Sequence, residues 1–135
     1  MSYRIEEIEG IGPSYGSKLE AAGIHTTNDL LKHCASRAGR KKVAEAADIS
    51  EKLLLKWANL ADLMRIKGIG KQFSELLEAG GVDTIKELRH RNAENLTAKL
   101  REANAEKKLT RAVPGLAQVE AWIASAKELD PTITH

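Results

Sequence analysis

A short glycine-containing stretch occurs twice in this chain of 135 residues, as Ile8-Glu9-Gly10-Ile11-Gly12 and as Ile66-Lys67-Gly68-Ile69-Gly70. Glycine adopts positive φ without a Cβ clash, so each Gly-Ile-Gly stretch predicts a sharp turn between two helices, with glycine geometry needed at both glycines. The N–H groups that begin the following helix would face the turn, a geometry that suits a phosphate group. A helix–helix corner without any ligand is the alternative interpretation.

The repetition extends well beyond the two turns. The offset between the copies is 58 residues (68 − 10), and no gap is needed from residue 5 to residue 31. The matched pairs include Tyr15/Phe73, Leu19/Leu77, Gly23/Gly81, Thr26/Thr84 and Leu30/Leu88. Trp57 and Trp122 form a later pair at an offset of 65 (122 − 57), so the second copy contains an insertion, which we place at residues 104–112. This agreement indicates a duplicated structural unit.

The two turns, with the downstream Ala-Gly-Ile at 22–24 and Gly-Gly-Val at 80–82, resemble the helix-hairpin-helix motif of DNA repair and recombination proteins. The chain is also similar to a family of small, mostly bacterial proteins of unknown function that contain tandem copies of this motif. The resemblance covers nearly the whole chain if each copy includes its trailing helices. It implies contact with the DNA backbone at the turns, and binding of a monovalent cation by the turn carbonyls when DNA is present.

Composition and periodicity favour an all-α fold. Hydrophobic residues make up 42% of the chain and aromatic residues only 4%, which leaves a core of Leu, Ile and Ala that suits packed helices. No segment alternates with a period of two, so we expect no sheet. We predict one compact domain over residues 1–135, with two helix-hairpin-helix-containing repeats at about 4–49 and 50–130 that a long helix joins. The second hairpin lies at residues 66–71.

Capping residues set the expected helix boundaries. Pro13 suits the first position of a helix that ends near residue 22. Thr26 and Asp29 form a possible capping box, and Ser36 can open a helix that runs to about residue 47. Ser50 opens what we expect to be the longest helix, which continues into the second turn. We expect further helices at 4–9, 71–79, 84–91, 93–103 and from 116, and an unstructured tail at 131–135.

We find no pattern typical of an active site, a metal site or a cofactor-binding loop. The four histidines are scattered, and Cys34 beside His33 faces another direction on a helix, so we interpret Cys34 as a buried structural residue. Gly68–Lys71 lacks the spacing of a Walker loop. Trp57 and Trp122 have leucine-type neighbours at helical spacing and are interpreted as core residues. We therefore expect no enzyme, catalytic residue, metal or cofactor.

The single cysteine excludes an intrachain disulfide and is typical of a reducing compartment. The N-terminal residues lack the apolar stretch of a signal peptide, and no apolar run approaches membrane-spanning length. We expect a cytoplasmic protein without a membrane partner.

The two turns differ in charge. Glu7 and Glu9 precede the first turn, whereas Arg65 and Lys67 take the matched positions before the second. Carboxylates oppose phosphate binding and basic side chains support it, so the second turn is the better candidate for nucleic acid. The predicted nucleic-acid-binding residues are Arg65, Lys67, Gly68, Ile69, Gly70 and Lys71, with one phosphate on the N–H groups of 68–70, then Gly10, Ile11, Gly12 and Lys18, and a basic helix face of Arg37, Arg40 and Lys41.

Two functional hypotheses follow. The first is a non-enzymatic module that binds the DNA backbone without sequence specificity, mostly through the second turn. The second is a protein-interaction or scaffold module, which the acidic first turn and the formal net charge of only +2 favour. The residues do not specify the partner or the oligomeric state.

Overall fold

Two groups of helices pack around two apolar cores in the computed structural model, which describes residues 2–130 and 132–134. The elements are the 3₁₀ turn η1 (Ile5–Glu7) and the helices α1 (Pro13–Ala21), α2 (Thr27–Cys34), α3 (Arg37–Ala47), α4 (Glu51–Leu63), α5 (Lys71–Ala79), α6 (Ile85–Leu88), α7 (Ala93–Lys107) and α8 (Leu116–Glu128). Within the described residues there is no strand, only an isolated bridge between Arg4 and Thr26. The all-α prediction is confirmed.

Helix starts follow the capping residues. Pro13 occupies the first position of α1, as expected. The Thr26 hydroxyl accepts a hydrogen bond from the Asp29 N–H at 3.1 Å, and the Asp29 carboxylate accepts one from the Thr26 N–H at 3.1 Å. Ser36 and Ser50 each accept a bond from the N–H three residues further on. These bonds satisfy N–H groups that a helix start leaves without partners.

The second copy departs from the first after α6. Asn92 caps α7, whereas the position that matches Ser36 at the common offset would be 94 (36 + 58), so the chain leaves α6 early. The helix α6 consequently has four residues and ends before residue 91, contrary to expectation. The insertion is partly helical and lengthens α7 to 15 residues, so α7, not the 13-residue α4, is the longest helix in the described part of the chain.

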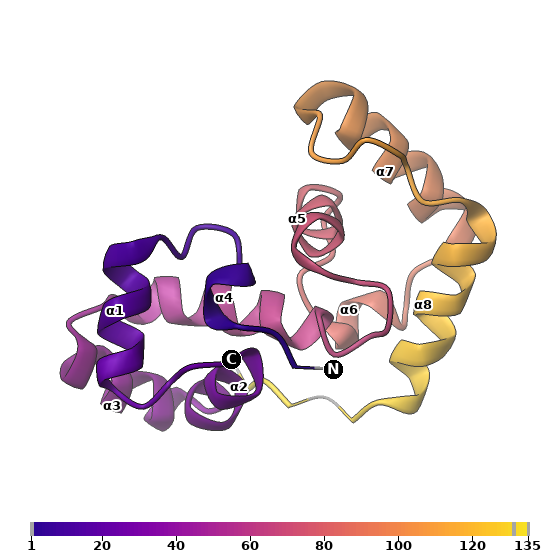
Figure 1. The fold of residues 1–135 in the computed structure, drawn as a ribbon. Helices are drawn as coiled ribbons and strands as arrows, with labels where there is room; N and C mark the ends of the chain where they lie inside the picture. Colours follow the sequence, from indigo (N-terminus) through magenta and orange to yellow (C-terminus); the bar gives the residue numbers. More distant parts are fainter. Residues whose placement is uncertain (1, 131, 135) are drawn as a thin grey trace.

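The helix α4 connects the two groups (Figure 1). Most of its buried side chains, Trp57 among them, belong to the first core, whereas Leu63 belongs to the second. It ends at Leu63, before Ile66, so the expected continuation of this helix into the second turn is wrong. The two cores therefore meet at the C-terminal end of α4.

Each core contains a matched aromatic pair. The ring centroids of Tyr15 and Trp57 are 5.0 Å apart, and those of Phe73 and Trp122 are 5.2 Å apart. Trp57 is 1% exposed and Trp122 is 2% exposed, which confirms that both tryptophans are core residues. Edge-to-face and tilted packing of this kind stabilises a core beyond the buried area alone.

Residues 132–134 return to the first group of helices. Ile133 packs against the first core, and the Thr134 N–H donates to the Ala35 carbonyl at 2.9 Å. The Arg40 guanidinium donates to the Thr134 carbonyl at 2.6 Å. The expected unstructured tail is wrong for these residues, because the corner between α2 and α3 satisfies their backbone groups; residues 131 and 135 lie outside the described part.

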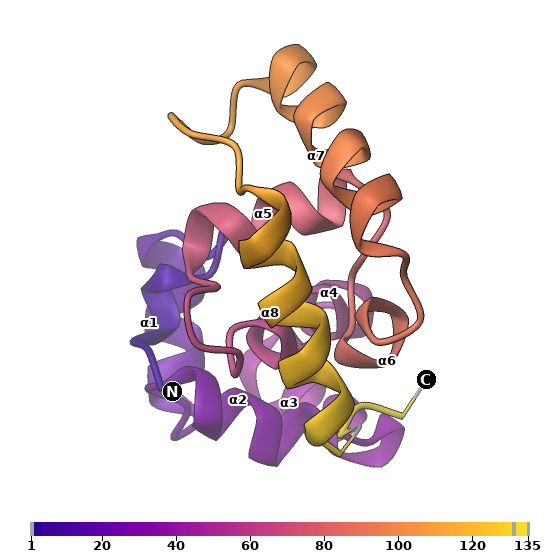
Figure 2. The same cartoon turned by 90° about the vertical axis from the view of Figure 1, so that its right-hand side faces the viewer.

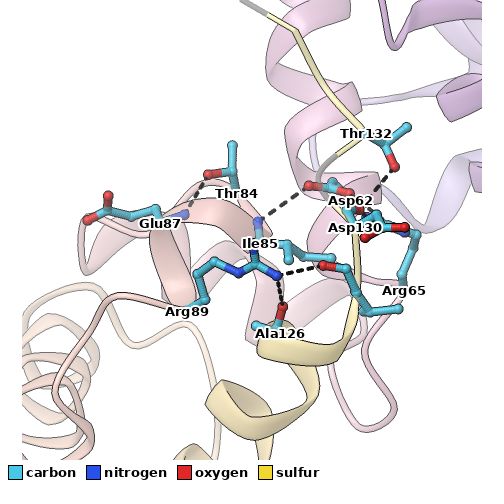
Figure 3. Close-up of polar contacts among 10 residues, drawn as sticks. Asp62, Arg65, Thr84, Ile85, Glu87, Arg89, Ala126, Asp130 and Thr132 are labelled. Carbon is cyan, nitrogen blue, oxygen red and sulfur yellow. Dashed lines mark hydrogen bonds and ion pairs between the residues drawn. The ribbon is translucent and has the colours of Figure 1, made fainter.

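A buried carboxylate joins three elements of the second group (Figure 3). Asp62 is 2% exposed and accepts hydrogen bonds from the Arg65 guanidinium at 2.6 and 2.9 Å and from the Ile85 N–H at 3.3 Å. Arg65 also donates to the Asp130 carbonyl at 2.9 Å. The ends of α4 and α8 are thus held at the start of α6.

Figure 2 shows α8 running down one face of the second group, in contact with α6 and α7. Its C-terminal carbonyls would lack helical partners, but Arg89 donates to the carbonyls of Ala126, Lys127 and Leu129 at 3.1, 3.2 and 2.8 Å. A cation at a helix C-terminus is also favoured by the helix dipole. Among the helices of the described residues, none is long and apolar enough to span a membrane.

Candidate functional site

The two Gly-x-Gly stretches form the same turn. The first glycine of each has positive φ, +94° at Gly10 and +93° at Gly68. In each turn the N–H of the following isoleucine donates to the carbonyl two residues before that glycine, at 3.2 and 3.1 Å. This is the geometry of a reverse turn that requires glycine at its third position. The turns expected at Gly10 and Gly68 are therefore present, with like backbone conformations.

The second glycine of each stretch has a different role. Gly12 and Gly70 are N-cap residues of α1 and α5, with φ of −86° and −106°. This is an extended conformation that other residues adopt, and a Cβ at either position would meet no atom within 4 Å. The expectation that both glycines of a turn need glycine geometry is therefore wrong for Gly12 and Gly70.

The free backbone donors of the second turn lie at the start of α5. The Ile69 N–H is used within the turn, where it donates to the Ile66 carbonyl, so it is not a free donor for a phosphate as predicted. Among the described residues, the N–H groups of residues 70–73 have no acceptor. They lie at the positive end of the helix dipole. The Gly68 N–H also has no acceptor in the described residues, so of the predicted donors at 68–70 only that of Ile69 is excluded, and the donors that suit an anion extend to residue 73.

Acidic side chains of the first turn lie beside these donors. A hollow of about 380 Å³ is lined by Glu7 and residues 70–73. The Glu9 carboxylate lies 3.6 Å from the Lys71 ammonium group. Burial raises the pKa of the nearby Glu75 carboxyl, and the Glu9 charge raises it further while Lys71 lowers it. The first turn therefore supplies negative charge at the start of α5.

The sequence interpretation missed this contact between the turns, although the charges indicate it. Glu7 matches Arg65, and Glu9 matches Lys67, at the 58-residue offset. Opposite charges at equivalent positions of a duplicated unit are compatible with the two copies packing turn against turn. This signal was available before the structure, but it does not tell which atoms meet.

The basic side chains of the second turn differ in how exposed they are and in whether they already have a partner. Lys67 and Lys71 are exposed, and Lys71 forms the ion pair with Glu9. Arg65 is half-buried, because its guanidinium is engaged by Asp62 and by the Asp130 carbonyl. Lys67 and Lys71 are therefore the side chains that could reach a phosphate at this turn, and Arg65 supports the fold.

The first turn is acidic. Its hollow, of about 500 Å³, is lined by Arg4 and Gly12 together with three glutamates, Glu6, Glu7 and Glu20. Lys18, the predicted basic residue of this copy, donates to the Asp48 carbonyl at 3.3 Å and lies over the Tyr15 ring at 5.9 Å from its centroid. In the described residues the cations near the first turn are already paired, Arg4 with Glu6 at 3.4 Å and Lys18 with Asp48 at 4.0 Å, so Glu7 and Glu20 leave the hollow with negative charge.

The predicted basic face of α3 is divided. Arg37 and Lys41 are exposed, but Arg40 is only 4% exposed and donates to the Cys34 and Ala35 carbonyls at 2.9 and 3.0 Å. A buried guanidinium whose donors meet backbone carbonyls cannot contact nucleic acid. The assignment of Arg40 to an exposed binding face is therefore wrong, and its charge stabilises the C-terminal end of α2.

Cys34 is fully buried beside Arg40. Burial raises the pKa of the Cys34 thiol to about 11, although the Arg40 charge lowers it in part. No group of three or more histidine, cysteine or carboxylate side chains that could hold a metal ion occurs in residues 2–130 and 132–134. Since the thiolate is the reactive form of cysteine, Cys34 has the environment of an unreactive residue.

The raised pKa predicts a specific pH dependence of stability. Below about pH 9 the thiol is protonated in both the folded and the unfolded chain, and the full contribution to stability is present. Above this value the unfolded chain loses the proton first, so stability should fall until the folded pKa near 11 is passed. Urea unfolding from pH 8 to 11 should show a steeper loss for the native protein than for Cys34→Ala. Parallel curves would contradict this prediction.

The family comparison covers most of the chain. Residues 9–129 match the model of a domain of unknown function (DUF4332). No significant match is found among curated proteins or among solved structures. The matched segment includes the first turn from residue 9 on, the whole second turn, the aromatic pairs and helices α1–α8. The chain therefore belongs to the DUF4332 family of domains of unknown function.

Proposed function

We propose that the protein is a non-enzymatic, cytoplasmic nucleic-acid-binding module that uses its second helix-hairpin-helix turn to contact the phosphate backbone. The observation that carries the proposal is the set of N–H groups of residues 70–73 that have no acceptor in the described part of the chain. Lys71 lines the hollow at these N–H groups, and Lys67, which is also exposed, lies three residues before Gly70 in the second turn. Such contacts position a backbone without reading its bases, so the binding has no sequence specificity.

The acidic first turn makes this binding weak. A phosphate at the start of α5 must compete with Glu9 for Lys71 and must approach Glu7, which lines the same hollow. Few phosphates would be neutralised, so affinity should depend on salt with a small slope, about −0.9 in log affinity per log salt for each phosphate. Arg37 and Lys41 form a separate exposed basic surface that could add contacts.

Reversing the charge of both lysines should abolish most of this binding. The variant Lys67→Glu with Lys71→Glu replaces two attractive charges by two repulsive ones, so its affinity for duplex DNA at low salt should fall by about tenfold or more. Fluorescence anisotropy with labelled duplex and single-stranded DNA at two salt concentrations measures this effect.

The matched control is Lys86→Glu with Lys107→Glu, because both lysines are exposed and neither has an ion-pair partner in the described residues. This control changes the net charge by the same amount as the test variant, so it measures the effect of net charge alone. We expect its affinity to lie within about twofold of that of the native protein. Glu9→Gln, which releases Lys71, should bind more tightly. Equal weakening in both double variants would contradict a contact at the second turn and make Arg37 and Lys41 the next residues to change.

A protein-interaction or scaffold module is the second candidate function. The Glu9–Lys71 ion pair favours it, because this pair neutralises within the chain the charge that a phosphate would need. If the folded native protein binds no nucleic acid even at low salt, the first proposal is wrong and this second function takes its place.

A further inference from the structure

A hollow between α2 and α3 differs in charge from the other hollows of the molecule. Its volume is about 340 Å³, within the range of small-molecule sites. It is lined by Ala22, Lys32, His33, Ser36, Gly39, Lys42, Val43 and Ala46, without any carboxylate. Each of four other hollows in the described residues is lined by at least one glutamate. Of these five hollows, it is therefore the one whose lining holds two lysines and no carboxylate.

The lining residues divide into an apolar part and a basic part. Val43 is buried, and Ala22 and Ala46 add small apolar side chains beside it. Lys32 and Lys42 are exposed and have no ion-pair partner within residues 2–130 and 132–134. Positive side chains around an apolar floor match a ligand that has both an apolar body and a negative group.

The hollow lies beside a corner at which α2 and α3 approach each other closely. A Cβ on Gly39 would lie 2.2 Å from the His33 carbonyl oxygen, so the start of α3 approaches the end of α2 as closely as glycine allows. The Ser36 hydroxyl accepts a hydrogen bond from the Gly39 N–H at 3.0 Å. At the same corner the Arg40 guanidinium donates to the Cys34 carbonyl at 2.9 Å. Most of the lining side chains thus belong to α2, α3 and the corner between them, where these hydrogen bonds hold the two helices in place.

We propose that this hollow is a binding site for a small organic anion with an apolar body and a carboxylate group. The carboxylate lies between Lys32 and Lys42, and the apolar body covers Val43 and Ala46. This site is distinct from the second turn, and it does not depend on nucleic-acid binding.

The test uses the ¹⁵N-labelled full chain and three probes. Octanoate has both features of the ligand, acetate has the charge alone, and 1-octanol has the apolar body alone. Octanoate should cause saturable chemical-shift changes confined to residues 22 and 32–46, while the same concentrations of acetate and 1-octanol should cause none. Equal binding of octanoate and 1-octanol would contradict the role of the lysines, and octanoate shifts spread over the whole chain would overturn the site.

Two variants locate the binding. Lys32→Gln with Lys42→Gln should weaken octanoate binding at least about tenfold, because it removes both free cations of the rim. Ala46→Phe places a ring over the hollow from an exposed helical position and should block the site without disturbing the core. Lys86→Gln with Lys107→Gln is the matched control and should bind as the native protein does. Unchanged affinity in the first two variants, with native spectra elsewhere, would overturn the proposal.

Discussion

Replacing Gly10 or Gly68 by alanine should lower the free energy of unfolding by about 1–3 kcal/mol in each case, because an L-residue is strained at these φ angles. The added Cβ would also lie 3.3 Å from the Nε1 atom of Trp57 or of Trp122. The tryptophan rings are buried, so they cannot move aside without disturbing a core. Thermal unfolding should show midpoints lower by about 3–5 °C for each kcal/mol in a chain of this size.

The second glycine of each turn provides the matched control. Gly12→Ala and Gly70→Ala add the same methyl group two residues further on, where φ is negative and the surrounding space is open. Alanine is a poorer N-cap than glycine but loses less chain entropy on folding, so these opposing effects should leave the variants within about 0.5 kcal/mol of the native protein. If Gly12→Ala were as destabilised as Gly10→Ala, the account of the turn would be wrong.

Replacing Arg40 by alanine should cost about 2–4 kcal/mol of unfolding free energy, because three backbone carbonyls lose a charged hydrogen-bond donor and the bond to one of them is buried. Two of these carbonyls, of Cys34 and Ala35, end α2, and the third, of Thr134, belongs to the returning tail. Arg40→Lys should have an intermediate effect, because one ammonium group cannot reproduce the fork of a guanidinium. Urea unfolding measures the loss.

Two further measurements make the Arg40 prediction specific. Lys41→Ala, at the neighbouring exposed position, should change stability by less than about 0.5 kcal/mol. In Arg40→Ala, NMR relaxation should report fast motion of residues 132–134, which are held by this side chain in the native protein. A variant that keeps the tail ordered and the stability unchanged would show that Arg40 does not fasten the tail.

Local chemistry explains why so much of the fold can be read from the sequence. A Thr or Ser that can accept a bond three residues on starts a helix in either copy, and glycine before an apolar residue marks the turn. Residues 58 positions apart are equivalent in the two copies, so an element predicted in one copy is also predicted in the other. The predicted ends of α6 and α7 are wrong, and both lie where the offset between the copies changes. The Asn92 cap comes early and ends α6 sooner, and the insertion lengthens α7.

Contacts between distant segments could not be read in the same way. The pair of Glu9 and Lys71 and the bond between Arg40 and the tail each join residues more than 60 positions apart. Arg40 is an intermediate case: it lies on one helical stripe with Val43 and Ala47, which are buried, so periodicity already placed it toward the core. Its positive charge led to the opposite assignment. The carbonyls that accept hydrogen bonds from Arg40 belong to residues 34, 35 and 134, which lie outside α3, so the pattern of α3 alone does not reveal them.

The returning tail also links the end of the second copy to the first copy. At the offset of 65 that relates Trp57 to Trp122, residues 66–70, which form the second turn, match residues 131–135. Here residues 132–134 are bound to the corner of α2 and α3 in the first copy. The end of the second copy is therefore tied to the first copy by backbone bonds, in addition to the connection through α4.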